Sequence, residues 1–519
     1  EGLELLGLGK RTARHAENAF RIRVRPPLQV ALDPGSGGGR LPELVSLRDH
    51  PVDVSRSSVQ EMEEKQHLPA NPRPDGETVT YAAACLPPGI LWPHDPHPYD
   101  VLIYHLQLPR EWIELGRIRT LDHNVYSFFP LAQEMHFLAM MLLRGSPWAG
   151  MFSAQFVSVW IGTAAVAGVY GAARRLWPAQ PWAGHLAGVA MACCPWVMML
   201  SSVAYNETWL LLFAGLCFAW VVLGLSEPSR AVGRFMVAGV MAGFACGGKY
   251  TAVPMVLAPA LAAGGLLLLG RVRPATWGRA TGAMLLVAVA AASPWYVRNA
   301  VATGNAVFPL AMDALGGGHF TPEQRARWQR AHAPRDSEKP VARRLELLGE
   351  RVFMDIRYGY VLLPAGLAVL VLSRRRESAA LSLGIVAMAG AWLTATHLQG
   401  RFLVAAIPLA ALGLGQTRRR WSAAAGAAAV VAGVLLTFAI AQRPSPPPGS
   451  AASELWGRLA LTEPRGMLVG FSDLDILLSP DARGLVADGR RLALVGDGRA
   501  FAYRLPPGKI GRASCRERV

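Results

Sequence analysis

The sequence is poor in charged residues and in cysteine. Only 17% of its 519 residues are charged, whereas soluble domains average about 25%. This deficit argues against an ordinary soluble protein. Six cysteines are present and no Cys-x-x-Cys pair occurs. Four of them (Cys193, Cys194, Cys217 and Cys246) fall inside apolar runs, where small buried hydrophobic residues are expected and not a disulfide or metal framework.

The sequence also begins at Glu1 without an initial Met, a signal peptide or a full-length first apolar span. Residues 1–75 are rich in Arg, Pro and Gly and lack sustained periodicity, so we interpret them as a disordered or a mistranslated tail. Residues 510–519, IGRASCRERV, are similar to a translated sequencing adapter. Such segments are left out of fold reasoning. We expect the natural ends of the protein to lie outside the printed sequence.

Long apolar runs are abundant, and 52% of the chain is hydrophobic. The runs are about 17–25 residues long, which is the length of a helix that crosses a hydrocarbon core. We therefore predict an all-α polytopic membrane protein. The clearest predicted spans are Ala149–Tyr170, Ala183–Val203, Thr208–Leu225, Ala280–Val297, Ala379–Thr396 and Trp421–Ala441.

The formal charge of +16 does not indicate nucleic acid, because much of it lies in short loops between apolar runs. One pair of spans separates each basic cluster from the next, once the Phe235–Leu269 run is split near Gly247. All the clusters therefore fall on one side, which the positive-inside rule assigns to the cytoplasm. The clusters are Arg174-Arg175, Arg230 with Arg234, Arg271 with Arg273 and Arg279, Arg374–Arg376, and Arg418–Arg420.

The opposite, outer side receives polar groups from five segments that are far apart in the sequence. Ionisable groups at the membrane boundary are costly and usually face a protein cavity. We therefore predict one outward-facing polar pocket. Its candidate residues are Asp100, Tyr104, His105, Asn206, Glu207, Lys249, Arg298, Asn299, Asn305, His397 and Arg401.

Several of these residues also have an ordinary structural interpretation. Lys249 and Arg401 are suited to extending toward the membrane interface as flanking cations. Glu207 is suited to a helix N-terminus, and His397 alone is typical of an interface histidine. Asp100, in the run PYDVLIYHLQLP, has no evident packing role. The functional interpretation is favoured because these polar residues all fall on the same side of the predicted membrane domain.

The residue types point to group transfer from a lipid-linked phosphate. Arg and Lys bind phosphate, Arg in a bidentate manner and Lys as a point charge. The same cations stabilise charge that develops on a leaving phosphate. An aspartate such as Asp100 is suited to taking a proton from an attacking hydroxyl or amine within hydrogen-bond reach.

The chain resembles the GT-C superfamily of multi-span glycosyltransferases. Within this superfamily it is most similar to the branch that contains protein mannosyltransferases and the aminoarabinose lipid A transferase. The segments that carry the resemblance are YDVLIYHLQLPREWIELGRI, HNVYSFFPLAQEMHFLAMML, SSVAYNETW, GGKYTAVP, PWYVRNAVATGNAVFPL and GRFLVAAIPLAAL.

The resemblance implies a bundle of roughly 10–11 transmembrane helices with interfacial helices in the first outer loop. It implies that Asp100 is the catalytic base and that Lys249 and Arg401 bind the donor phosphate. Glu207 stands near the position of a second acidic residue, where relatives usually have Asp. Tyr104, His105, Asn206, Arg298, Asn299, Asn305 and His397 are the further candidates for substrate binding.

The partners implied by the resemblance are the bilayer, a polyprenyl-phosphate sugar donor and a glycan, lipid or protein acceptor. The implied location is a bacterial inner membrane with the active site facing the periplasm. A divalent metal is an open possibility, because some relatives need one and others do not. The spacing of Asp100, Glu207 and His397 gives no metal signature.

The domain organisation predicted from these patterns has a catalytic membrane domain over residues 76–442. A stiff Pro-rich linker follows at 443–452, and 453–509 resembles the start of an outer soluble domain that is cut short. Asp100–Gly116 is predicted to be an interfacial element. Phe128–Leu143 is predicted to be a second such element or a short span, with Glu134 and His136 as possible substrate contacts. The outer loop Gly304–Arg357 has a glycine hinge suited to a substrate lid.

Three other function classes remain open. A secondary transporter also uses ionisable groups in broken helices, but its site is expected near the bilayer midplane. A polysaccharide ligase or polymerase also uses lipid-linked sugars, with a large Arg-rich outer loop late in the chain. A membrane scaffold would scatter the outer polar residues.

Overall fold

The computed structural model describes residue 84, residues 100–416 and 420–441, and four short strands. The chain divides into two units, Glu1–Pro69 with Gly470–Arg518, and chiefly Ala70–Val469. The first unit contains one sheet of strand order β2-β1-β3-β4, antiparallel except for the β3–β4 pair. Its strands are β1 (Gln29–Asp33), β2 (Leu44–Val45), β3 (Arg491–Val495) and β4 (Ile510–Gly511). Most of the predicted tail, the linker and the outer soluble segment lie outside the described residues.

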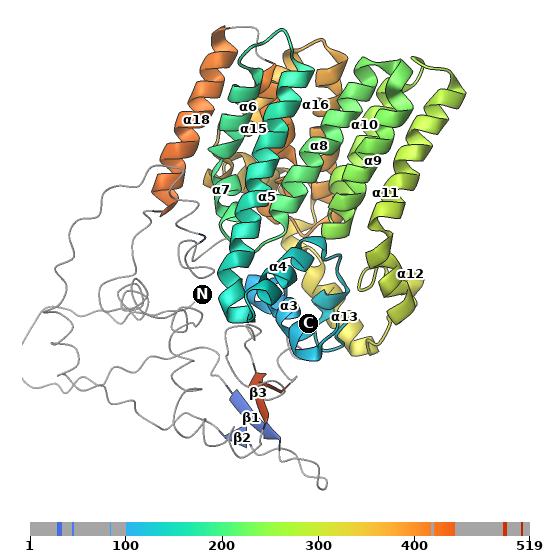
Figure 1. Cartoon of the computed structure of the whole chain (residues 1–519), viewed down its shortest axis with the longest axis vertical. Coiled ribbons are helices and arrows are strands. Elements are labelled where there is room, and N and C mark those ends of the chain that lie inside the picture. The colour runs from blue at the N-terminus through green and yellow to red at the C-terminus, as the bar shows by residue number, and fades with distance from the viewer. Residues whose placement is uncertain are drawn as a thin grey trace, which may run out of the picture. The chain divides into compact units, whose positions relative to one another are not determined.

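The second unit is all-helical in its described residues, which confirms the predicted fold class. Five helices are long and apolar enough to cross a membrane, or six if one bent pair counts as a span. The five are α5 (Pro147–Leu176), α8 (Glu207–Ser226), α9 (Ala231–Gly248), α11 (Pro274–Thr303) and α16 (Arg376–Ala395). Figure 1 shows them side by side in one bundle.

Shorter apolar helices complete the bundle. They are η5 (Val253–Leu257) with α10 (Ala258–Leu268), α15 (Leu362–Leu372), α17 (Ala406–Gly415) and the apolar part, Gly426–Thr437, of α18 (Arg420–Ala441). The six candidate spans and these four segments give ten, so the predicted 10–11 is reached if each short segment also crosses. The predicted division of the Phe235–Leu269 run is confirmed, since α9 ends at Gly248.

One predicted span is broken. The run Ala183–Val203 forms α6 (Ala183–Ala192) and α7 (Pro195–Ser201), which are bent by 64°. Pro195 is the cause, because it has no N–H to continue α6 and disfavours helical backbone at the preceding residue. Cys194 is accordingly extended, with φ −68° and ψ 124°. Pro195 then serves as the first residue of α7.

Helices α8, α9 and α11 position the predicted outer groups at one end of the bundle. Gly239 and Gly243 of α9 pack on α11, where an added Cβ would lie 2.4 Å from the carbonyl oxygen of Met284 and 2.6 Å from that of Ala288. Such small residues four apart allow close helix approach. A basic cluster flanks one end of each helix, and Glu207, Lys249 and Arg298 lie at or near the other ends.

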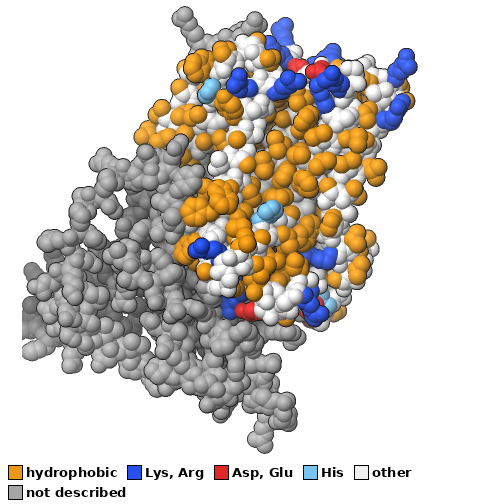
Figure 2. Space-filling model, in the orientation of Figure 1, with side chains coloured by type: hydrophobic (Ala, Val, Ile, Leu, Met, Phe, Trp, Pro, Cys, Tyr) orange, Lys and Arg blue, Asp and Glu red, His pale blue; other side chains and the backbone are white. Residues whose placement is uncertain are grey.

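Figure 2 shows the same polarity on the surface. Lys and Arg gather at the end of the bundle away from the small helices, and a broad hydrophobic belt separates the two ends.

The short elements at the connections are η4 (Pro228–Arg230), η6 (Asp336–Glu338), α14 (Val341–Leu348), η7 (Gly349–Phe353), η8 (Ile356–Tyr358) and η9 (Gly400–Leu403).

Small helices cover the other end of the bundle. The predicted helical segment after Asp100 is confirmed as η2 (Val101–His105) and α3 (Gln107–Leu115), and Gly116 ends it in a left-handed conformation with φ +64°. Around it lie η3 (Val125–Phe128), α4 (Ala132–Leu143), α12 (Met312–Leu315) and α13 (Pro322–His332). A buried aromatic cluster that includes Phe128, Phe308 and Trp328 joins η3 to α13.

Candidate active site

Four charged side chains from four separate parts of the chain meet in one ionic cluster. Asp100 precedes η2, Glu207 begins α8, Lys249 follows α9 and Arg401 lies in η9. Arg401 Nη2 contacts Asp100 Oδ2, and Lys249 Nζ lies 2.5 Å from Glu207 Oε1. Arg401 Nε is 3.8 Å from the same Glu207 oxygen. Four residues of the predicted pocket are therefore brought together.

The ionic cluster is shielded from water and electrically balanced. The Glu207 side chain is 1% exposed, and those of Lys249, Asp100 and Arg401 are 13–19% exposed. Removing charges from water is expensive unless each finds a partner. Two carboxylates and two cations satisfy this requirement, so the cations are held in place by the acidic residues.

Aromatic rings fix the direction of both cations. The Arg401 guanidinium lies 5.1 Å from the ring centre of Tyr205, and Lys249 Nζ lies 5.4 Å from that of Phe402. Arg401 is also 5.7 Å from Phe402. A cation over an aromatic face within about 6 Å is attracted by the ring. The rings therefore limit where the two positive groups can point.

A buried pair, His105 and Glu134, adjoins the ionic cluster. His105 Nδ1 lies 2.5 Å from Glu134 Oε1, and neither side chain is exposed. Burial raises the pKa of Glu134 to about 8 and lowers that of His105, whose charged form Lys249 and Arg401 also disfavour. At pH 7 the carboxyl group is therefore protonated and the ring is neutral, so the pair carries no net charge.

Asn206 connects this pair to the ionic cluster. Its Nδ2 donates to the carbonyl oxygen of Gly248 at 3.0 Å and to Glu134 Oε1 at 3.4 Å. Glu134 was outside the predicted pocket, although an acid in the apolar run FFPLAQEMHFLAMMLL is the signal expected of a functional residue. Glu134 lies on α4, and the packing of α4 on α5 and α3 brings the residue to the site.

Four buried polar atoms in this region have no hydrogen-bond partner among the described residues: His105 Nε2, Glu134 Oε2, Asn206 Oδ1 and Glu207 Oε2. Buried polar atoms in proteins are nearly always paired, so a group of unpaired ones calls for an explanation. The region has hydrogen-bonding capacity that the described residues do not use.

Tyr104 and His397 border the cluster. The Tyr104 ring stacks on Tyr126 with centres 4.7 Å apart, and burial raises the pKa of its hydroxyl. His397 lies 4.9 Å from Phe402. Burial, followed by the neighbouring His332 and Arg401, lowers the pKa of His397 to about 4. His397 is therefore neutral at pH 7.

Arg298, Asn299 and Asn305 make structural contacts near the outer end of α11. Asn299 Nδ2 donates to the carbonyl oxygen of Phe128 at 2.5 Å and to the Tyr250 hydroxyl at 2.7 Å. Arg298 donates to the carbonyl oxygen of Phe129 at 3.0 Å. Asn305 donates to the carbonyl oxygens of Leu310 and Gly316 and so closes the loop that follows α11. Their predicted role in substrate binding stays a prediction.

Metal binding was an open possibility from the sequence. Within the part of the chain that the structure describes, no group of three or more His, Cys, Asp or Glu side chains is arranged to hold a metal ion. Asp100 and Glu207 instead face cations, and His397 packs on an aromatic ring.

Comparison with known proteins identifies one family. Residues 137–297 match the family described as dolichyl-phosphate-mannose-protein mannosyltransferase. The matched segment includes Glu207 and Lys249 and ends before Arg298, and it does not reach Asp100 or Arg401. No curated protein sequence matches the chain at a significant level.

Two solved structures resemble the fold. The crystal structure of ArnT from Cupriavidus metallidurans bound to undecaprenyl phosphate shares 17% identity at a TM-score of 0.48, with 82% of this chain and 74% of that chain covered. The apo structure of the same protein shares 18% identity at 0.44, with 67% and 62% covered. At these TM-scores the likeness carries no functional weight. Over residues 137–297 the chain is similar to the dolichyl-phosphate-mannose-protein mannosyltransferases, and the resemblance to the GT-C glycosyltransferases predicted from its sequence is confirmed.

Proposed function

We propose that this protein transfers a sugar from a polyprenyl-phosphate donor to an acceptor at the periplasmic face of a bacterial inner membrane. The observation that carries the proposal is the contact of Asp100 with Arg401 beside the Glu207–Lys249 pair. This arrangement puts a candidate base and two candidate phosphate ligands within one small cluster. The family match over residues 137–297 supports the glycosyltransferase class.

Lys249 and Arg401 bind the donor phosphate in this proposal. Each cation already contacts a carboxylate, so an incoming phosphate replaces a carboxylate oxygen as its partner. Phosphate accepts charge-assisted hydrogen bonds from both cations, and the guanidinium is suited to a bidentate contact. Glu207, which contacts both cations, holds them at a fixed separation.

Asp100 is the base in the transfer step. The acceptor oxygen attacks the anomeric carbon of the donor sugar, and its proton passes to the Asp100 carboxylate. The bond between the anomeric carbon and the phosphate oxygen breaks, and the polyprenyl phosphate leaves with the electron pair. The phosphate gains one negative charge in this step, which Lys249 and Arg401 stabilise. Binding of the phosphate to Arg401 also releases Asp100 from its ion pair.

The sugar contacts the polar atoms that the protein leaves unpaired. His105 Nε2 is suited to donating to a sugar hydroxyl, because Nδ1 is occupied by Glu134. Asn206 Oδ1 and Glu207 Oε2 are suited to accepting from other hydroxyls. Tyr104 and His397 flank this region and complete the proposed substrate site.

The test is mass spectrometry of lipids that co-purify with the detergent-solubilised full chain. The site variant is Lys249→Gln/Arg401→Gln, and the matched control Arg273→Gln/Arg279→Gln removes two exposed cations near the start of α11. We expect a polyprenyl-phosphate sugar with the wild type and the control, and none with the folded site variant. Retention of the same lipid by the folded site variant would contradict the phosphate-binding roles, and a different bound solute would favour a transporter.

A further inference from the structure

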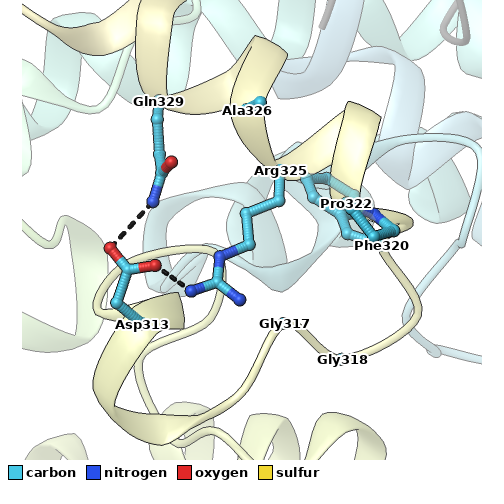
Figure 3. Close-up of a pocket in the computed structure, with 8 residues that line it drawn as sticks. All are labelled: Asp313, Gly317, Gly318, Phe320, Pro322, Arg325, Ala326 and Gln329. Atoms are coloured by element: carbon cyan, nitrogen blue, oxygen red, sulfur yellow. Dashed lines mark hydrogen bonds and ion pairs between the residues drawn. The ribbon is translucent and has the colours of Figure 1, made fainter.

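A separate hollow of about 350 Å³ lies between α12 and α13. Figure 3 shows it with Asp313 on one side and Arg325 and Gln329 on the other, and with the loop of Gly317 and Gly318 beside them. Its volume is at the lower end of the range of small-molecule sites, about 300–1,000 Å³. None of its lining residues belongs to the ionic cluster.

The polar side of the hollow carries no net charge. Arg325 Nη2 contacts Asp313 Oδ1, and Gln329 Nε2 donates to Asp313 Oδ2 at 2.9 Å. Arg325 and Gln329 are one helical turn apart on α13 and therefore present the same face. One carboxylate and one guanidinium balance each other, so neither an anion nor a cation is preferred. The site instead suits a neutral ligand with several hydrogen-bonding groups.

The polar groups remain available to a ligand. The Asp313 side chain is 74% exposed and that of Arg325 is 35% exposed. Ion pairs so accessible to water contribute little to stability. The hydroxyls of a ligand can therefore insert between Asp313 and its partners at little cost.

An aromatic wall faces the same space. Phe320 is half-buried, and its ring packs edge-on against Phe308 with centres 5.1 Å apart. An aromatic ring beside carboxylate, amide and guanidinium groups fits a molecule with hydroxyls around its edge and an apolar ring face. Saccharides have this character. The backbone of Gly317 and Gly318 forms another part of the lining, where neither residue has a side chain.

Hydrogen bonds fix the backbone on both sides of the hollow. Asn305, which is fully buried, donates to the carbonyl oxygen of Gly316 at 3.0 Å and to that of Leu310 at 2.8 Å. Thr321 and Gln324 form a capping box at the start of α13. The geometry is therefore fixed before any ligand arrives, which lowers the entropic cost of binding.

A chain of ring contacts runs from α13 to the ionic cluster. Trp328, next to Gln329, stacks on His332 with ring centres 3.6 Å apart, and His332 lies 6.0 Å from His397. His397 in turn packs on Phe402, over which Lys249 and Arg401 lie. Helix α13 therefore carries residues of the hollow and residues of the ring contacts that lead to the ionic cluster.

We propose that the hollow between Asp313, Phe320, Arg325 and Gln329 binds a neutral saccharide unit of the acceptor. Its identification as an acceptor subsite rests on the proposed function, whereas saccharide binding does not. An acceptor that fills both places has at least one sugar beyond the unit that receives the transferred group. The hollow then selects glycan or glycolipid acceptors over acceptors without sugar.

The test is binding of the fluorescently labelled full chain, in detergent, to an array of neutral and anionic oligosaccharides. The pocket variant is Arg325→Ala/Gln329→Ala. The control is Arg330→Ala, which removes an exposed cation of the same helix that does not line the hollow. We expect the wild type and the control to retain a subset of neutral glycans, and the pocket variant to lose at least about tenfold in signal, which corresponds to about 1.4 kcal/mol.

Three results would overturn the proposal: no glycan retained by the wild type, only anionic glycans retained, or an unchanged pattern for the pocket variant. A thermal unfolding curve like that of the wild type confirms that the pocket variant is folded. The co-purifying lipid separates the two hypotheses. Lipid retained with no glycan binding leaves the donor proposal intact and removes this one. Glycan binding without a donor lipid supports the saccharide site and removes its role as an acceptor subsite.

Discussion

Glu207 Oε1 lies 2.5 Å from Lys249 Nζ, so a fully buried carboxylate on the first residue of α8 is paired with the cation that follows α9. Arg401 Nε, from η9, is 3.8 Å from the same oxygen. One acidic oxygen therefore serves both candidate phosphate ligands. The charges of the two carboxylates and the two cations balance. In the proposed mechanism, a phosphate that binds here therefore replaces a carboxylate as the partner of Lys249 and Arg401.

The pairing at Glu207 predicts strong coupling to Lys249. Glu207→Gln leaves two cations with only Asp100 as an acidic partner, and breaking a buried pair costs about 3–5 kcal/mol. The double variant Glu207→Gln/Lys249→Gln removes both members. We expect its loss in the free energy of unfolding to be smaller than the sum of the single losses by about 0.5–3 kcal/mol. Denaturant unfolding in detergent measures this, and strictly additive losses would contradict a direct pair.

Asp100→Asn tests the proposed base. The amide keeps the shape of the carboxylate but cannot take up the proton, so we expect transfer to fall by about 10²–10⁴-fold. Co-purification of the donor lipid is expected to persist, because Lys249 and Arg401 remain. The control is Asp122→Asn, an exposed aspartate of the same outer loop. Full activity of Asp100→Asn would exclude Asp100 as the base.

Glu134 predicts a dependence of stability on pH. Its pKa is raised from 4.5 to about 8 by burial, so the folded protein binds a proton that the unfolded chain releases above its ordinary pKa. Stability from this group is complete below the unfolded pKa and is lost as the pH rises through about 8. Glu134→Gln imitates the neutral acid beside His105. We expect the variant to lose less thermal stability than the wild type between pH 7 and pH 9, and parallel curves would argue against the neutral pair.

Asn299 predicts a purely structural effect. Its amide donates to the carbonyl oxygen of Phe128 and to the Tyr250 hydroxyl. Removing it leaves the Phe128 carbonyl oxygen with only the Tyr250 hydroxyl as donor, at 3.2 Å, and the loss of buried hydrogen bonds costs about 1–3 kcal/mol. We expect Asn299→Ala to lower the unfolding free energy while the co-purifying lipid stays the same. Asn206→Ala, which removes a group beside Glu134, is expected to weaken lipid retention. A loss of lipid from Asn299→Ala that is equal to the loss from Asn206→Ala would place Asn299 in the substrate site.

The sequence predicted the helical membrane class well because apolar runs of spanning length are a local property. It also placed the break between α9 and α10 at the glycine pair, where helix propensity falls. It predicted one span over Ala183–Val203, and the structure divides this run at Pro195 into the bent pair α6 and α7. The proline was visible in the sequence, but a long apolar run does not reveal whether it is kinked or continuous.

The site was predictable as a set of residue types on one side, and not as a set of contacts. Sidedness follows from the spacing of basic loops, which requires no knowledge of packing. The sequence could not show that Arg401 contacts Asp100 across 301 positions, or that Asn299 turns toward the carbonyl oxygen of Phe128. It also left Glu134 outside the predicted pocket.

The sequence by itself thus determined the apolar helices, the sides on which their polar ends lie and the resemblance to a family, since each depends on residue order alone. The tertiary structure decided which polar groups pair, which are neutral and which remain unpaired. The physical reason is that charge balance and desolvation depend on distances between residues of different helices. Those distances are set by packing such as that of Gly243 on Ala288, which no local pattern encodes.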